Sequence, residues 1–245
     1  MDTIIAGRKP VIEALRAGTA IERVVLLAGV QGQGIADIQR LAQQARIPVV
    51  QVPRQEFRGL APDHATQGVI AVVPARSFVE LEEILEHPRK RHEQGFLLVL
   101  DEIEDPHNLG ALVRTAECAG VHGVIIPKHH AATVTSAVVK TSAGATEHMP
   151  IAEVTNIAHT LKQLKDEGYW VVGLDAAGDR LYTAVDLELP IALVVGNEGR
   201  GIRRLVRERC DFLVKIPLRG KISSLNASVA GAVVMYEVLR QRTKL

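Results

Sequence analysis

Six short apolar runs in the second half of the chain constrain the fold more than any other feature. They are nearly continuous in Val, Ile and Leu and read FLLVLDEI, GVIIP, MPIAEV, YWVVGLDA, IALVVG and FLVKIPL. Such runs are typical of strands buried on both faces, as in a parallel sheet covered by helices. Helical patterns separate them, from NLGALVRTAECAG to SSLNASVAGAVVMYEVLRQR. The sequence therefore predicts an α/β domain with a doubly wound parallel sheet over residues 95–245.

The first 75 residues predict a smaller α/β unit. A helix that ends at Gly18 and a second over GIADIQRLAQQARI alternate with strands in ERVVLLAG, PVVQVP and QGVIAVVP. Residues 76–94 are charged and contain one short helical pattern and no strand pattern. We therefore expect a linker over 76–94, between units at 1–75 and 95–245.

Composition narrows the possible functions. The chain has only two cysteines and no CxxC pair, which argues against a disulfide framework and a cysteine-rich zinc site. His129 and His130 are adjacent, and His107, His122 and His148 form no HxxxH or HExxH pattern. The longest apolar run is far shorter than the ~20 residues of a membrane span, and the N-terminus lacks the pattern of a signal peptide. We expect a cytoplasmic protein without metal or membrane contact.

Positive charge is local, because the net charge of the whole chain is only +1. Between Gly196 and Lys221 eight basic residues face three acidic ones. The basic ones are Arg200, Arg203, Arg204, Arg207, Arg209, Lys215, Arg219 and Lys221. A solvated helix face would explain their exposure, whereas the excess of one sign favours phosphate binding. Aromatic residues make up 3% of the chain, which disfavours base-stacking platforms.

Three polar loops follow predicted strands, where ligands bind in open parallel sheets. They read PHNLGALVRTAECAG, GNEGRGI and RGKISSLNAS. Each has a structural interpretation: Asn108 could cap a helix from Leu109, GNEGRG could be a tight turn, and Ser223 or Ser224 could cap the last helix. None has the glycine order of a dinucleotide fold or the GK[ST] of a P-loop. Three such loops in one domain are nevertheless more than capping requires.

In order and spacing these segments resemble motifs 1, 2 and 3 of the SpoU (TrmH-like) family of SPOUT RNA 2′-O-methyltransferases. The first unit, opening IIAGRKPVIEAL, resembles the ribosomal-protein-like RNA-binding module of members that methylate a guanosine of 23S ribosomal RNA. The resemblance implies a deep trefoil knot, a homodimer and S-adenosylmethionine (SAM) as the cofactor. It also implies a catalytic set of Arg114, Glu198, Asn108, Ser224 and Asn226, and cofactor contacts from Gly196, Asn197, Ile216, Leu218 and Leu225.

These residues suit methyl transfer to a ribose hydroxyl, which needs alignment and removal of a proton. Arginine is effectively never deprotonated, so Arg114 is expected to hold a phosphate and stabilise developing negative charge. The proton would leave to phosphate, water or Glu198, which could instead orient its neighbours. The expected function is SAM-dependent 2′-O-methylation of a guanosine in 23S ribosomal RNA. The alternatives are a transfer-RNA methyltransferase of the same family and a non-catalytic RNA-binding protein with this fold.

Overall fold

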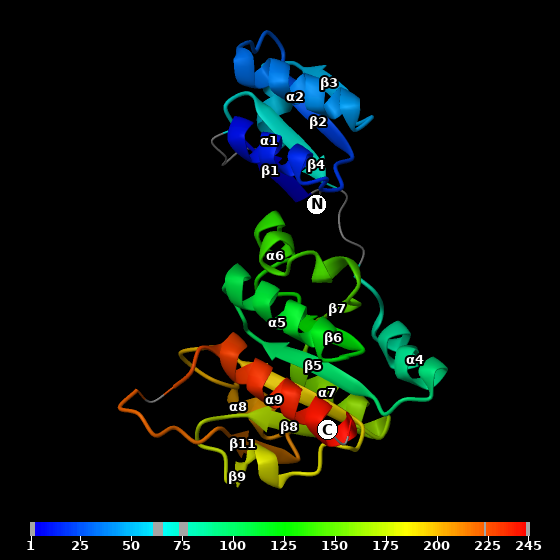
Figure 1. The fold of residues 1–245 in the computed structure, drawn as a ribbon, viewed down its shortest axis with the longest axis vertical. Helices are drawn as coiled ribbons and strands as arrows, with labels where there is room; N and C mark the ends of the chain where they lie inside the picture. The colour runs from blue at the N-terminus through cyan, green and yellow to red at the C-terminus, as the bar shows by residue number, and fades with distance from the viewer. Residues whose placement is uncertain (1–2, 61–65, 74–77, 223, 244–245) are drawn as a thin grey trace. The chain divides into compact units, whose positions relative to one another are not determined.

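The chain divides into two compact units, Met1–Ser77 and Phe78–Leu245. The computed structural model (Figure 1) describes residues 3–60, 66–73, 78–222 and 224–243, with the side chains of Thr3 and Ser136 left aside. Each unit has its own sheet and core.

The first unit is a four-stranded sheet with the order β1-β4-β2-β3. Only the β2–β3 pair is parallel, and the other two pairs are antiparallel. The strands are β1 (Thr3–Ala6), β2 (Arg23–Leu27), β3 (Val49–Val52) and β4 (Val69–Val73). The sequence predicted the last three and missed β1, whose four residues are too few for a clear alternating pattern.

Helices cover both faces of this sheet. They are α1 (Arg8–Arg16), α2 (Gln33–Gln44) and α3 (Arg54–Leu60). Alternate residues of β2 divide between two clusters, because successive side chains of a strand point to opposite faces. Val24 and Leu26 pack in the cluster that holds α1 and α2, and Val25 packs with Phe57 of α3.

The second unit is a seven-stranded sheet with the order β7-β6-β5-β10-β8-β11-β9, and every strand pair in it is parallel. The strands are β5 (Phe96–Asp101), β6 (Gly123–Pro127), β7 (Ile151–Val154), β8 (Trp170–Leu174), β9 (Arg180–Leu181), β10 (Ile191–Gly196) and β11 (Phe212–Lys215). All six apolar runs form strands, which confirms the predicted parallel sheet. The two-residue β9 was not predicted.

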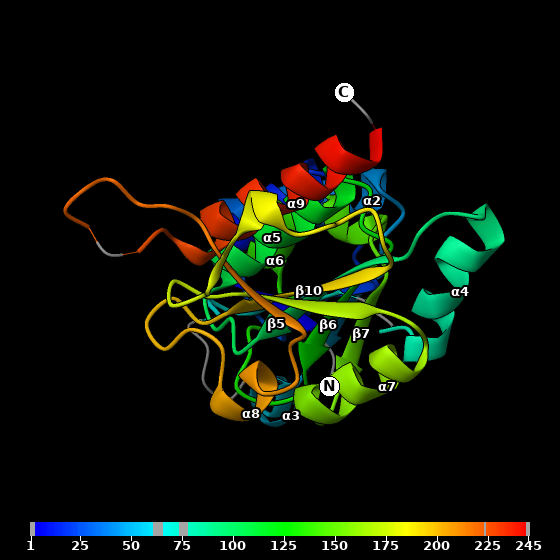
Figure 2. The same cartoon turned by 90° about the horizontal axis from the view of Figure 1, so that it is seen from below.

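Helices lie on both faces of this sheet (Figure 2). They are α4 (Leu81–Arg91), α5 (Pro106–Cys118), α6 (Ser136–Thr141), α7 (Ile157–Asp166), α8 (Arg204–Arg207) and α9 (Ala227–Thr243). Phe96, Leu98 and Leu100 of β5 pack with residues of α5, α6 and α9, whereas Leu97 and Val99 pack with α4, α7 and α8. The helix predicted around GIRRLVRERC is a single turn, α8.

The segment 76–94 differs from our expectation of a linker. It contains α4, whose Ile84 and Leu85 are buried in the core of the second unit. The methyl groups of Ile84 fill the space beside Gly123 of β6, where a Cβ would lie 2.4 Å from Ile84 Cγ2. The boundary between the units therefore falls between Ser77 and Phe78.

The last helix, α9, is fastened near its C-terminal end by Arg242. Its guanidinium donates hydrogen bonds to four backbone carbonyls, those of Gln94, Gly95, Leu187 and Leu189. These carbonyls lie just before β5 and β10, and burial lowers the pKa of Arg242. The end of α9 is thus tied to the amino ends of the two central strands.

Candidate functional site

The start of α5 is set by Asp105. This residue caps the helix by accepting a hydrogen bond from the His107 amide at 2.9 Å, and Pro106 occupies the first helical position. One interpretation of the sequence, in which Asn108 caps this helix, is therefore wrong. Asn108 lies inside the first turn with 5% of its surface exposed, so its amide is free to bond elsewhere.

Asn226 caps α9, and it performs a second task. Its Oδ1 accepts hydrogen bonds from the amides of Ser228 at 2.9 Å and Val229 at 3.3 Å. Its Nδ2 donates to Asn108 Oδ1 at 2.9 Å and to Glu198 Oε1 at 2.5 Å. The expected serine cap is wrong for Ser224, because α9 begins at Ala227; Ser224 is exposed, and Ser223 lies outside the described residues.

Asn108 completes the cluster by donating from Nδ2 to Glu198 Oε1 at 2.5 Å. We call Asn108, Glu198 and Asn226 the Asn–Glu–Asn cluster. It joins the three polar loops that the sequence singled out, although Asn108 and Asn226 are 118 positions apart. One carboxylate oxygen accepts from both amides, so the arrangement fixes the orientation of all three side chains.

Glu198 is held by the tight turn that follows β10. Asn197 Oδ1 accepts from the amides of Gly199 at 3.0 Å and Arg200 at 3.3 Å, and its backbone pairs with Gly201. A Cβ on Gly196 would lie 2.3 Å from the carbonyl carbon of Gly201, so only glycine allows the turn to fold back on itself.

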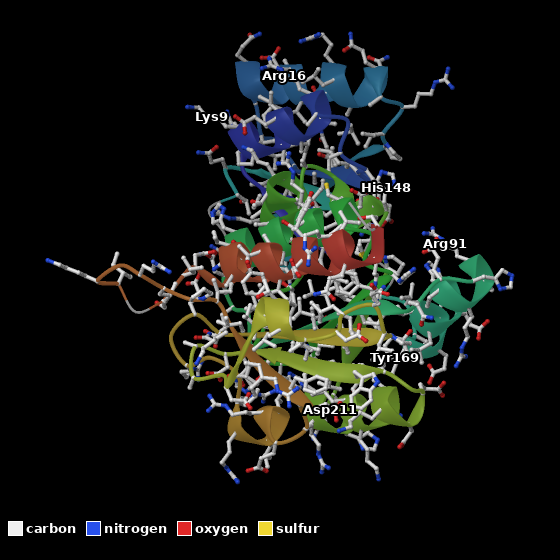
Figure 3. All side chains as sticks on the ribbon, turned by 60° about the horizontal axis from the view of Figure 1, so that its bottom comes forward. Lys9, Arg16, Arg91, His148, Tyr169 and Asp211 are labelled. Carbon is white, nitrogen blue, oxygen red and sulfur yellow. The ribbon has the colours of Figure 1, made fainter. Side chains whose placement is uncertain are left out.

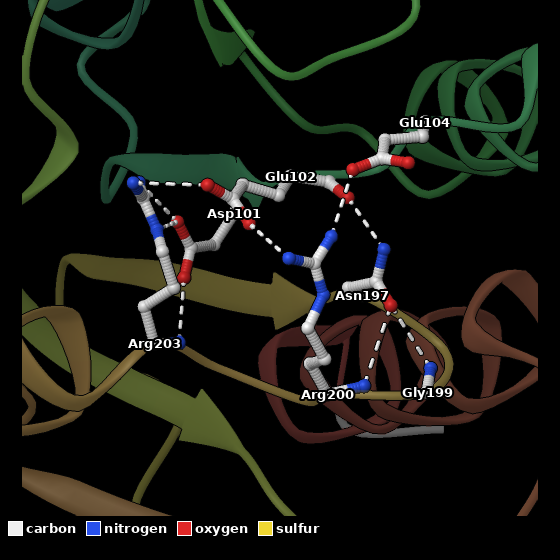
Figure 4. A network of polar contacts seen from close by, with 7 residues as sticks. All are labelled: Asp101, Glu102, Glu104, Asn197, Gly199, Arg200 and Arg203. Atoms are coloured by element: carbon white, nitrogen blue, oxygen red, sulfur yellow. Dashed lines mark hydrogen bonds and ion pairs between the residues drawn. The ribbon is translucent and has the colours of Figure 1, made fainter.

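An arginine clamp, made by Arg203 and Asp101, connects this turn to the carboxyl end of β5 (Figure 4). Asp101 is fully buried and accepts from the Arg203 amide at 2.8 Å, from Nε at 2.8 Å and from a terminal nitrogen at 2.6 Å. The hydrogen bond to Asp101 raises the pKa of Arg203. The sequence analysis did not name Asp101 and named Arg203 only as one of eight basic residues, although the acidic stretch LDEIED at the end of β5 was a visible signal.

Glu102 adopts a left-handed backbone conformation, with φ of 59°, which is unusual for this residue type. Two contacts hold it there. Its carbonyl accepts from Asn197 Nδ2 at 3.0 Å, and its carboxylate lies 3.1 Å from Arg203. The turn after β10 and the loop after β5 are therefore mutually supported.

The arginines around this turn are ion-paired, which bears on their expected phosphate binding. Arg200 pairs with Glu104 at 2.8 Å (Figure 4), and the clamp engages Arg203. The further pairs are Arg204 with Glu208 at 2.8 Å and Arg207 with Asp175 at 2.6 Å. Each of these four arginines therefore has a carboxylate at ion-pair distance, so less of its charge is available to a phosphate than that of an unpaired arginine.

Two residues of the expected catalytic set, Arg114 and Ser224, make no hydrogen bond with the cluster in the described structure. Arg114 is exposed on α5, and within the described part of the chain no ion pair or hydrogen bond of its guanidinium is found. Six residues separate it from Asn108, which at about 100° per residue places the two about 120° apart around the helix. The two side chains thus leave α5 on different sides.

The segment between β11 and α9 carries the remaining expected cofactor residues. Ile216 packs against the core, whereas Leu218 is 40% exposed and Leu225 is 38% exposed. Exposed leucines in a segment that follows the carboxyl end of a strand offer an apolar surface to a ligand. Gly196 and Asn197 lie at the carboxyl end of the central strand β10, which β8 separates from β11.

The described residues give less support for a metal site or for a segment that crosses a membrane. Among them no group of three or more His, Cys, Asp or Glu side chains could hold a metal ion. No helix in the described ranges combines the length and apolarity that a bilayer crossing requires. Two surface hollows, one between α7 and α8 and one between α4 and α7, share no residue with the Asn–Glu–Asn cluster.

Comparison with known proteins identifies the family to which the chain is similar. Residues 95–236 match the SpoU rRNA Methylase family, and residues 4–79 match the family described as RNA 2′-O ribose methyltransferase substrate binding. The putative TrmH family tRNA/rRNA methyltransferase YacO of Bacillus subtilis is 44% identical over 239 residues, which are 97% of this chain and 95% of the relative.

Solved structures agree. The SpoU methyltransferase AviRb from Streptomyces viridochromogenes, in complex with the cofactor AdoMet, has a TM-score of 0.68 at 25% identity and covers 99% of this chain and 91% of its own. The TrmH/SpoU tRNA modifying enzyme of A. aeolicus, at a TM-score of 0.56 and 28% identity, covers 67% of this chain and 85% of its own. With a family match over more than half its length and a close relative along nearly all of it, the chain belongs to the SpoU rRNA methylase family.

Proposed function

We propose that this protein transfers a methyl group from SAM to the 2′-hydroxyl of a guanosine in 23S ribosomal RNA, in the cytoplasm and as a homodimer. The observation that carries the proposal is the Asn–Glu–Asn cluster, because it gathers one polar residue from each of the three motif segments. A protein that had kept only the fold would not need this cluster, which argues against the non-catalytic alternative.

Ribosomal RNA is favoured over transfer RNA by the first unit. The A. aeolicus enzyme, described as tRNA modifying, covers a share of this chain comparable in size to the second unit alone, whereas the match described as RNA 2′-O ribose methyltransferase substrate binding accounts for the first unit. A four-stranded unit whose α1 exposes Lys9 and Arg16 (Figure 3) has basic side chains available for RNA phosphates. Methylation of a loop guanosine in transfer RNA is the second candidate.

The residues at the carboxyl ends of β10 and β11 fit SAM. The cofactor has no phosphate, and this site offers backbone groups and apolar side chains in place of a glycine-rich phosphate loop. Gly196 and Asn197 would hold it on one side, and Ile216, Leu218 and Leu225 on the other. The two leucines are already exposed and would become covered.

When bound, SAM supplies a methyl group on a positively charged sulfur; a bond forms from the 2′-oxygen to the methyl carbon as the carbon–sulfur bond breaks. The Arg114 guanidinium stays protonated, so it holds a neighbouring phosphate and stabilises negative charge on the 2′-oxygen. Glu198 orients both asparagines through Oε1. The proton leaves to water, phosphate or Glu198, and Asn108, Ser224 and Asn226 position the ribose.

Dimerisation would bring Arg114 to a cluster from which it points away. The exposed side of α9 carries Val229 and Tyr236, each 50% exposed, and α9 packs against α5, on which Arg114 is exposed. Ala227 and Val234 of α9 are buried in the core and do not belong to this surface. We propose that α5 and α9 pair with their copies, that residues of both subunits complete each site, and that the last segments form a trefoil knot.

A mapping experiment tests the reaction. Ribosomal and transfer RNA from a strain lacking the protein are mapped for 2′-O-methyl groups and compared with strains that carry the wild type or Arg114→Ala. One guanosine of 23S RNA should lose its methyl group and regain it only with the wild type. A methyl group missing from transfer RNA alone would establish the second candidate, and restoration by Arg114→Ala would refute the role of Arg114.

Subunit mixing tests the shared site. Arg114→Ala and Glu198→Ala should each be inactive alone. If Arg114 acts on the partner's cluster, random mixing yields heterodimers with one intact site, and activity should return to about a quarter of the wild type. No recovery, with heterodimers shown by mass spectrometry, would place both residues in the same subunit's site.

A further inference from the structure

The segment between β11 and α9 carries positive charge that no carboxylate balances. No Asp or Glu occurs between Phe212 and Tyr236, a stretch that contains Lys215, Arg219 and Lys221. Arg219 and Lys221 are exposed, and within the described residues neither forms an ion pair. The arginines of the neighbouring turn and α8 differ, since Arg200, Arg203, Arg204 and Arg207 are all paired. Apart from Arg209, which follows α8 and is also exposed without an ion pair in the described residues, the unpaired basic side chains of this region lie in this one segment.

This segment is tethered beside the Asn–Glu–Asn cluster. Asn226 belongs to the cluster, and Lys221 and Arg219 precede it by five and seven positions. A fully extended chain spans at most about 3.6 Å per residue, so their Cα atoms lie within about 18 Å and 25 Å of Asn226. That range includes the nucleotides on either side of a ribose held at the cluster.

The conformation of the segment also suits contact with a ligand outside the sheet. The described residues from Ile216 to Asn226 form neither helix nor strand, and the segment projects away from the sheet (Figures 1 and 2). Ile222 next to Lys221 is 77% exposed. Leu218 precedes Arg219 and Leu225 follows Lys221. The two ends of the segment can therefore contact the cofactor while its middle contacts a second ligand.

We propose that Arg219 and Lys221 bind backbone phosphates of the RNA next to the methylated ribose, and that the ion-paired arginines of the turn and α8 do not. This inference rests on the proposed function for its ligand. The pair acts by neutralising phosphates, a contact that carries no base specificity but fixes the register of the strand. Each neutralised phosphate of single-stranded RNA lowers the slope of log K against log salt by about 0.7.

The test compares two variants with the same change in net charge. Arg219→Gln/Lys221→Gln removes the proposed contacts. Arg89→Gln/Arg204→Gln is the control, because both arginines are exposed in the same unit and are paired, with Glu86 and Glu208. Binding of an unmodified 23S RNA transcript is measured by filter retention from 0.05 to 0.3 M KCl, and binding of S-adenosylhomocysteine by calorimetry.

We expect the first variant to lose about 1.4 from the salt slope and roughly 10-fold in RNA affinity at 0.15 M KCl. The control should lose less than half as much, and S-adenosylhomocysteine should bind both variants as it binds the wild type. Equal losses in the two variants, or an unchanged slope in the first, would overturn the inference. If the salt slopes of the wild type and the first variant differ as expected but the wild type methylates no RNA, the proposed reaction is refuted and the phosphate contacts remain supported.

Discussion

Replacing Asp101 with asparagine tests whether the arginine clamp supports the site. The side chain keeps its size but loses its charge. The carboxylate accepts hydrogen bonds from three N–H groups of Arg203, and in the variant one of its oxygens becomes an NH₂ group, which cannot accept them. Breaking a fully buried ion pair costs about 3–5 kcal/mol. The Arg203 side chain is 44% exposed, and water will solvate part of the freed charge. We therefore expect a loss of about 2–3 kcal/mol in the free energy of unfolding, close to one strong charge-assisted hydrogen bond.

Urea unfolding followed by tryptophan fluorescence measures this loss of unfolding free energy in the second unit of the chain. The only tryptophan, Trp170, lies in β8 of the second unit and stacks on Phe212 at 5.5 Å between ring centroids. For a unit of this size the loss corresponds to a fall in Tm of about 4–12 °C. Affinity for S-adenosylhomocysteine should fall as well, because the turn that carries Glu198 loses its anchor.

The control for this prediction is an exposed pair. Glu208→Gln breaks the contact with Arg204, whose side chain is 79% exposed, and should cost less than about 1 kcal/mol. A double-mutant cycle with Arg203→Gln then isolates the coupling between the clamp residues. If Asp101→Asn unfolds like the wild type, or if the cycle shows no coupling, the clamp does not stabilise the turn.

Three further predictions concern single positions. Gly196→Ala should weaken S-adenosylhomocysteine binding in calorimetry by 10-fold or more, because the new Cβ meets the backbone of Gly201 at 2.3 Å; wild-type affinity would show that the turn can move. Burial lowers the pKa of His122 below 6.5, so the unfolded chain binds this proton more readily and stability should fall as the pH drops below about 6.5. The unfolding free energy of His122→Gln should fall less steeply between pH 7 and 5, and equal slopes would contradict this. Burial raises the pKa of Cys210 to about 12, so a thiol reagent at pH 8 should label exposed Cys118 and spare Cys210 in the folded protein, as peptide mass mapping would reveal.

The sheet of the second unit could be predicted because its signal is local. Each strand is a continuous apolar run, and burial on both faces leaves a compositional mark that needs no partner to interpret. The short β9 and the single turn of α8 carry no such mark. The segment 76–94 was predicted to be a linker because charged residues dominate it, although burial of Ile84 and Leu85 is enough to hold α4 against the sheet.

The candidate site was accessible from the sequence only in part. The three loops could be singled out because strand ends meet at one edge of a parallel sheet, and the family resemblance then named Asn108, Glu198 and Asn226 within them. The clamp could not, since a carboxylate after β5 has several basic residues to choose from, and only the tertiary fold selects Arg203. The same selection gave Arg200, Arg204 and Arg207 carboxylate partners and left Arg219 and Lys221 without any in the described chain.

The separation between the cluster residues also affects how the protein is made. Asn226 follows Asn108 by 118 positions, and it can bond to Asn108 and Glu198 only after it has left the ribosome. At about 5–20 residues per second, synthesis of that interval takes on the order of 6–24 s. During the last 28 positions of this interval β5, α5 and β10 have all been made, while Glu198 lacks its last partner and Arg242 has not yet reached its four carbonyls. A nascent chain stalled before Asn226 should therefore hold most of its sheet but no complete site, so the emergence of the last helix decides when the enzyme becomes competent.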